Sequence, residues 1–154
     1  MSIITALSNL FSGRSFSKIS AEQEKAMIDA LTYAMAVDRE IAGDEQKELT
    51  SSLRHVKWEE EIPLESYVSE SVARAKRISA QPGDAPDYLH QISERLGEDW
   101  LREETYYLAA RIAASDRDIV SAEQLLLSNM VQAFELDNDT QARIADQLMR
   151  ETDF

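Results

Sequence analysis

The chain has 154 residues, 44% of them hydrophobic, a size and composition that suit one domain with a single continuous core. Its 29 acidic and 16 basic residues give a formal net charge of -13, so the surface repels phosphate backbones and we expect no nucleic-acid partner. Cysteine is absent, which excludes disulfides, thiolate metal sites and thiol redox chemistry and fits a cytoplasmic protein.

Residues 1–19 form an N-terminal arm or short helix with an apolar stripe at helical spacing: Ile3, Ile4, Leu7, Leu10 and Phe11. The stretch lacks a basic leader and is too short and too polar for a signal peptide or a membrane span. Two interpretations stay open. Either the stripe packs on the rest of the protein, or residues 3–11 contact a membrane surface or a partner protein.

The remaining residues, 20–154, show helical periodicity throughout, and we interpret them as one all-α domain. Ser20 and Gln23 match a capping box, and the helix that follows presents one apolar face up to about Val37: Met27, Ile28, Leu31, Ala34 and Met35. A second helix begins at Gly43 or Asp44.

Pro63 suits the first position of a third helix, which runs to Ala80. Its last turn carries cations that complement the helix dipole: Arg74, Lys76 and Arg77. Residues 81–86, Gln-Pro-Gly-Asp-Ala-Pro, are rich in helix breakers and predict a hinge.

Four more helices follow, which makes about seven in all. A short helix ends at Gly97 and a longer one follows it. Ser121 and Gln124 repeat the capping-box pattern at the start of the next helix, and Asp139 caps the last one.

The second half repeats the first at a shift of 78 residues, because Asp38 aligns with Asp116 and 116 − 38 = 78. Without a gap, identical residues fall on one another in the two turns and the helices beside them: Ala36, Asp38, Arg39, Ile41, Glu45, Gln46 and Leu49 on Ala114, Asp116, Arg117, Ile119, Glu123, Gln124 and Leu127. We therefore expect a single-domain helical bundle built from two pseudo-symmetric helical-hairpin repeats, at about 20–80 and 87–150.

The repeated pattern, Ala-x-Asp-Arg-acid-Ile followed by Glu, resembles the TerB family of tellurite-resistance proteins and their TerB-like relatives. The resemblance covers roughly Ser20 to Leu148. It implies an all-helical fold with duplicated halves, and a cytosolic bacterial protein of tellurite tolerance, stress response or defence that acts through protein complexes. It also implies an acidic site for a divalent cation. Glycine commonly follows the first Asp of the family pattern, whereas Arg39 and Arg117 stand here, which indicates a divergent member.

Acidic side chains gather at both repeated turns and are the candidate metal ligands: Asp38, Glu40, Asp44 and Glu45 in the first, and Asp116, Asp118 and Glu123 in the second. Calcium and magnesium prefer such oxygen ligands. The alternative is that each Asp caps its turn while the adjacent Arg screens the helix end. An EF-hand is excluded, because its invariant glycine position falls on Arg39 or Arg117.

Enzymatic motifs are scarce. His55 and His90 have no neighbour at metal-ligand spacing and no nucleophile motif beside them, so we interpret each as a surface or boundary residue. The aromatic cluster of Trp100, Tyr106 and Tyr107 favours core packing over a partner groove. The sequence thus predicts a non-enzymatic TerB-like adaptor. A purely structural interaction module is the alternative, and a hydrolytic or acid-base enzyme using paired carboxylates is the weakest interpretation.

Overall fold

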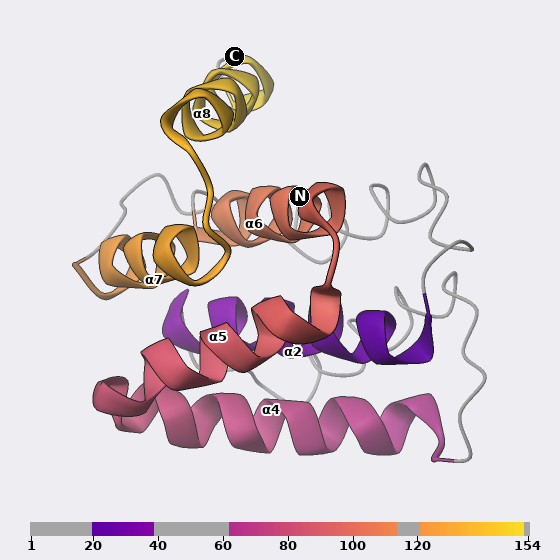
Figure 1. Ribbon diagram of the computed structural model, residues 1–154. Helices are drawn as coiled ribbons and strands as arrows, with labels where there is room; N and C mark the ends of the chain where they lie inside the picture. The colour runs from indigo at the N-terminus through magenta and orange to yellow at the C-terminus, as the bar shows by residue number, and fades with distance from the viewer. Residues whose placement is uncertain (1–19, 39–61, 114–120, 153–154) are drawn as a thin grey trace.

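The computed structural model describes residues 20–38, 62–113 and 121–152. These ranges contain six α-helices, one short 3-10 helix and no strand (Figure 1): α2 (Ala21–Asp38), α4 (Leu64–Ala80), η2 (Pro82–Asp84), α5 (Ala85–Leu96), α6 (Asp99–Ala113), α7 (Ser121–Ala133) and α8 (Asn138–Thr152). The expected all-α helical bundle is confirmed. The N-terminal segment 1–19 and the helix expected after Gly43 lie outside the described residues.

The bundle is arranged around α2. This helix packs against α4 and α6, and it also contacts α5 and α7. Figure 1 shows α4 as an outer layer, α2 and α5 next to it, α6 and α7 beyond them, and α8 farthest from α4. The principal contact of α8 is with α6. One buried apolar cluster includes residues from all six helices.

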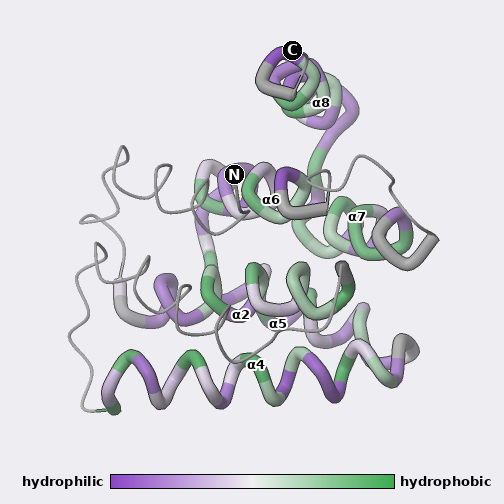
Figure 2. Tube along the Cα trace, turned by 180° about the vertical axis from the view of Figure 1, so that it is seen from behind, coloured by the Kyte–Doolittle hydropathy of each residue, from purple (hydrophilic) through white to green (hydrophobic). Residues whose placement is uncertain are grey.

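The central position of α2 buries its middle part on all sides. Every residue from Ala26 to Met35 is buried, including the polar Asp29 and Thr32. The expectation of a single apolar face is therefore wrong in extent, because neighbouring helices surround this one and leave it no solvent side. Figure 2 shows the contrast along α4, where hydrophilic and hydrophobic residues alternate as in an outer helix. Among the described helices, none combines the length and apolarity needed to cross a membrane.

Local signals at the start of α2 and the end of α5 act as expected. The Gln23 backbone N–H donates to Ser20 Oγ at 3.2 Å, and the Ser20 N–H donates to Gln23 Oε1 at 2.8 Å, which completes the capping box. Gly97 ends α5 in the left-handed conformation, with φ of 74°. Pro63 precedes α4 rather than being its first residue.

The start of α8 differs from the expectation. Asp137, not Asp139, caps this helix, because its Oδ1 accepts the Thr140 backbone N–H at 2.7 Å. The helix begins at Asn138, which places Asp139 inside its first turn. Glu135 has a positive φ of 55° and turns the chain after α7, so Asp137 is the residue that stands immediately before α8.

The breaker-rich segment 81–86 is a tight connection. The Gln81 and Asp84 backbone N–H groups donate to Ile78 and Gln81 carbonyls, each at 3.0 Å, and α5 begins at Ala85. Helices α4 and α5 contact each other and both pack on α2, so residues on both sides of this segment share one core. Its role as the hinge between two repeats stays a prediction.

Candidate functional site

The candidate metal ligands lie at the margins of the described residues. Asp38 is the last residue of α2 and Glu123 lies in α7, but the structure describes only their backbone. The other five lie outside the described residues: Glu40, Asp44, Glu45, Asp116 and Asp118. Within residues 20–38, 62–113 and 121–152, no group of three or more acidic or histidine side chains is placed to hold a metal ion. The cation site therefore stays a prediction.

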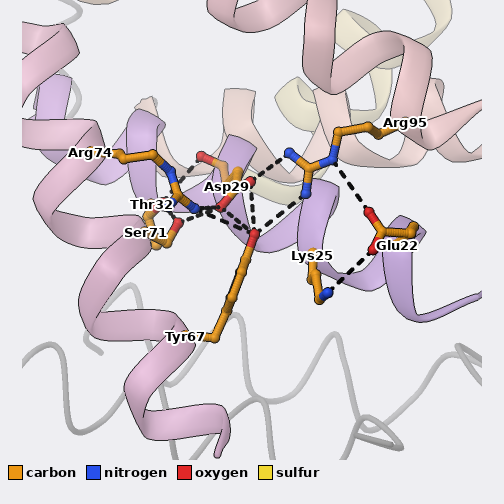
Figure 3. A network of polar contacts seen from close by, with 8 residues as sticks. All are labelled: Glu22, Lys25, Asp29, Thr32, Tyr67, Ser71, Arg74 and Arg95. Atoms are coloured by element: carbon orange, nitrogen blue, oxygen red, sulfur yellow. Dashed lines mark hydrogen bonds and ion pairs between the residues drawn. The ribbon is translucent and has the colours of Figure 1, made fainter. Parts of the chain in front are cut away.

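The most extensive cluster of described polar side chains surrounds Asp29, a carboxylate in the middle of α2 that is 1% exposed. Four side chains donate hydrogen bonds to it (Figure 3). The Tyr67 hydroxyl lies 2.9 and 3.0 Å from the two carboxylate oxygens, and Ser71 Oγ lies 2.7 Å from Oδ1. Arg74 Nη2 lies 3.1 Å from Oδ1, and Arg95 Nη1 lies 2.7 Å from Oδ2. The buried charge is thus both paired and fully hydrogen-bonded, as a stable buried carboxylate requires.

Helical spacing explains how α4 supplies three of these donors. Tyr67, Ser71 and Arg74 follow one another at intervals of four and three residues, so they share the face of α4 that packs on α2. The fourth donor, Arg95, lies in the last turn of α5. Figure 3 shows the two arginines approaching Asp29 from opposite sides. The carboxylate therefore joins α2, α4 and α5 at one point.

The electrostatics of this cluster keep its groups in defined protonation states. Burial, reinforced by the neighbouring Asp29 carboxylate, raises the pKa of Tyr67 to about 12, so the phenol keeps its proton and donates it. Burial alone would lower the pKa of Arg74 and Arg95, but the contacts with Asp29 and Tyr67 together outweigh it and the pKa of each is raised. Both guanidiniums therefore stay charged.

A pocket of about 510 Å³ opens beside the cluster, between α2, α4 and α5. Three arginines and two tyrosines line it together with Gln91: Arg74, Arg77, Arg95, Tyr67 and Tyr88. Asp84 and Asp87, which are exposed, also line it. The side chains of Arg74 and Arg95 each keep 32% of their surface accessible, so solvent reaches both guanidiniums.

Tyr88 has an unusual environment in this pocket. Its ring contacts Tyr33 edge to face, with the centroids 5.8 Å apart. Its hydroxyl is buried, and no described group is placed to make a hydrogen bond of normal geometry with it. Burial raises the pKa of Tyr88 to about 12, and the nearby Arg74 guanidinium only partly opposes that rise. Arg74 is thus close enough to influence this hydroxyl electrostatically.

Sequence reasoning missed this cluster. Arg74 was expected to complement the helix dipole, whereas it reaches inward to a buried carboxylate. One signal was present, since Asp29 stands inside the apolar run from Ala26 to Met35 and must be paired there. Its partners on α4 and α5 are 38 to 66 positions away, and no local pattern identifies them.

A second hollow, of about 350 Å³, lies between α6 and α8. Residues of both helices line it: Trp100, Glu103, Glu104, Tyr107, Arg143, Ile144 and Gln147. The expectation that Trp100 packs in the core is wrong, because this side chain is 47% exposed and donates from Nε1 to Glu98 Oε2 at 2.7 Å. Tyr107 is buried as expected, and Tyr106 is partly buried. The aromatic cluster is thus divided between the core and the surface.

The histidines offer no catalytic arrangement among the described residues. His90 is exposed and lies 3.1 Å from the Glu94 carboxylate one turn later in α5, which confirms its surface position. His55 lies outside the described residues. At the first site the Ser71 and Tyr67 hydroxyls donate to the Asp29 carboxylate, which is itself held by two arginines.

No known protein-family model, curated protein or solved structure matches the chain. The resemblance to TerB therefore rests on the two repeated turns, and the function has to be argued from the described geometry.

Proposed function

We propose that the chain is a non-enzymatic, divergent TerB-like adaptor that joins other proteins of a bacterial stress-response or defence assembly related to tellurite resistance. The observation that carries this proposal is the half-exposed Trp100 at the groove between α6 and α8. A large aromatic side chain beside a groove is the kind of group that contributes most of the binding energy at protein interfaces.

The geometry of α8 supports the same function. This helix packs mainly on α6 and lies at the outside of the bundle (Figure 2). Its contact with α6 includes the buried Ile144 and an ion pair between Arg143 and Glu103. The groove is therefore formed by two helices that pack on each other, with Trp100 in its lining. A preformed groove costs little conformational entropy when a partner binds.

The chemistry of the partner follows from charge. The net charge of -13 attracts basic partners and repels acidic ones over the distance at which proteins first meet. We therefore propose a partner segment that combines an apolar side chain, which covers Trp100, with basic residues around it.

The two-repeat architecture belongs to the proposal as well. Helix α2 begins at residue 21 and α6 at residue 99, and 99 − 21 = 78, the same shift that aligns the repeated turns. α7 begins at residue 121, so the equivalent position in the first repeat is residue 43, where the sequence predicts a helix. The pairing of α2 with α6 is the contact expected between equivalent helices of a pseudo-twofold bundle.

Affinity purification from the native host tests the adaptor function. The full chain, a Trp100→Ala variant and a Leu125→Ala variant serve as baits; Leu125 is the matched control because it is 52% exposed on α7 and does not line the groove. We expect a partner that the wild type and the Leu125 variant retain and the Trp100 variant loses. Calorimetry with the purified partner then measures the loss directly. Equal retention by all three baits rejects the groove as the docking surface.

The cation site predicted at the repeated turns has a separate test. If Asp38 and its neighbours bind calcium or magnesium, either ion raises the melting temperature of the full chain, because a ligand that binds only the folded state stabilises it. Asp38→Asn then removes the rise. If neither ion changes the melting temperature, these carboxylates only cap helices. The result of the groove experiment does not depend on this outcome.

A further inference from the structure

We propose that the pocket between α2, α4 and α5 binds a small oxyanion, the carboxylate or phosphate group of a ligand, through Arg74, Arg77, Arg95 and the buried hydroxyl of Tyr88. This inference does not depend on the adaptor function. It concerns a pocket lined by three arginines, in a different part of the fold from the α6–α8 groove.

The charges at the inner end of the pocket favour the binding of an anion. Asp29 is one carboxylate facing two guanidiniums, and its four hydrogen-bond donors occupy both of its oxygens. The nearest additional carboxylate, Glu22, is 66% exposed and stays 4.0 Å from Arg95 Nε. The second guanidinium is therefore balanced only by exposed carboxylates: Glu22, and Asp84 and Asp87 of the pocket lining. An anion that enters the pocket completes this balance at close range.

The arginines also have further N–H donors for an anion. In this cluster Arg74 donates only through Nη2, to Asp29 at 3.1 Å and to the Tyr67 oxygen at 3.4 Å. A guanidinium carries five N–H donors, so Arg74 keeps donors beyond these contacts, although it also interacts with the Tyr88 oxygen. Arg77 also lines the pocket, is exposed, and makes no ion pair with any described residue. Guanidiniums with N–H donors to spare suit bidentate recognition of carboxylate or phosphate.

The Tyr88 hydroxyl is the third, independent observation. It is a buried polar group in the pocket lining; the Arg74 guanidinium beside it can only donate, and no described acceptor takes the hydroxyl proton. Leaving such a group unsatisfied costs about 1–3 kcal/mol, so native proteins normally supply a partner. Because burial raises the pKa of Tyr88 to about 12, the phenol keeps its proton at neutral pH, and the partner it lacks is an acceptor. An oxyanion held by Arg74 supplies one.

The arginine head groups are held in place before a ligand binds. Asp29 is 1% exposed and fixes the Arg74 and Arg95 head groups before any ligand arrives. The donors therefore pay little conformational entropy on binding. The pocket volume of about 510 Å³ fits a small metabolite better than a protein surface. Asp84 and Asp87 of the lining are exposed, so water weakens their repulsion of an anion, and acidic charges beyond about 8 Å are screened at physiological ionic strength.

Binding is measured with two probes, inorganic phosphate and succinate, each against sodium chloride at equal ionic strength, by calorimetry on the full chain. We expect at least one probe to bind and Arg77→Gln to weaken it about tenfold or more, the value of a charged hydrogen bond. Lys76→Gln is the matched control, because it removes a neighbouring exposed charge on α4 that does not line the pocket. Binding of phosphate alone assigns a phosphoryl ligand, of succinate alone a carboxylate, and of both an unselective oxyanion site.

Tyr88→Phe separates a ligand role from a structural one. This variant removes only the hydroxyl, so without probe we expect its melting temperature to equal or exceed that of the wild type, while its affinity for the bound probe falls. Three results overturn the inference: neither probe binds more tightly than chloride, Arg77→Gln and Lys76→Gln weaken binding alike, or Tyr88→Phe binds the probe as the wild type does.

Discussion

Asp29 and Arg95 are 66 positions apart in the chain, yet Arg95 Nη1 donates to Asp29 Oδ2 at 2.7 Å. This bond fastens the last turn of α5 to the middle of α2. A second contact acts at the same end of α5, where Gln23 Nε2 donates to the Leu96 carbonyl oxygen at 2.9 Å. Two helices from different parts of the chain are thus held in register by polar contacts at the edge of an apolar core.

Asp29→Asn is expected to destabilise the fold by about 3 kcal/mol, the lower end of the range for breaking a buried ion pair. The substitution leaves two guanidiniums without their counter-ion, and their 32% exposure moderates the loss. Urea unfolding followed by circular dichroism measures it. Glu70→Gln, which removes an exposed carboxylate from α4, is the control and should change little. A loss for Asp29→Asn as small as that of the control contradicts the central role of the cluster.

Stability is expected to fall at alkaline pH through Tyr67 and Tyr88. Burial raises the pKa of each from 10.0 to about 12, so the folded state holds these protons more tightly than the unfolded state. Their contribution is complete below about pH 10 and declines as the pH rises towards 12. Ultraviolet titration of the folded chain should show late-ionising phenols, and Tyr67→Phe should remove one of them. Phenols that all titrate near the ordinary value contradict the burial of these hydroxyls.

Gly97→Ala is expected to destabilise the protein by about 1 kcal/mol, because alanine resists the left-handed conformation. Gly97 has φ of 74°, and an added Cβ meets nothing closer than the Glu94 carbonyl oxygen at 3.8 Å, so the loss is conformational rather than steric. Gly83→Ala is the matched control, since a Cβ there meets no atom within 4 Å and its φ is not positive. Thermal melting of the two variants should differ; equal melting temperatures contradict the assignment.

Two variants, Ser20→Ala and Gln23→Ala, separate the stability contributed by the capping box of α2 from that contributed by the contact between α2 and α5. Losing Ser20 Oγ removes one capping bond, worth about 1 kcal/mol. Losing the Gln23 side chain removes a capping bond and also the bond to the Leu96 carbonyl, so we expect a loss of about 2 kcal/mol. Chemical unfolding of both variants gives the difference. A Gln23→Ala variant as stable as Ser20→Ala would show that the contact with α5 contributes nothing.

Much of the candidate binding chemistry could not be predicted from the sequence. The repeated turns predicted a metal site around Asp38 and Asp116, and that prediction remains untested because these carboxylates lie at or beyond the limits of the described residues. The Asp29 pocket and the exposed Trp100 were missed. The position of Asp29 in an apolar run showed that it needs partners but not which ones, and Trp100 is a residue type whose burial depends on its neighbours.

The sequence by itself determined where the described helices lie and how several of them end. The capping box of Ser20 and Gln23, the breakers at 81–86 and the left-handed Gly97 act within a few residues, so their effect can be read locally. Tertiary structure decided that α2 is surrounded, that Arg74 turns inward to Asp29, and that Trp100 stays in solvent. These outcomes depend on which helices pack against which, and burial and pairing between distant residues exist only once the chain has folded.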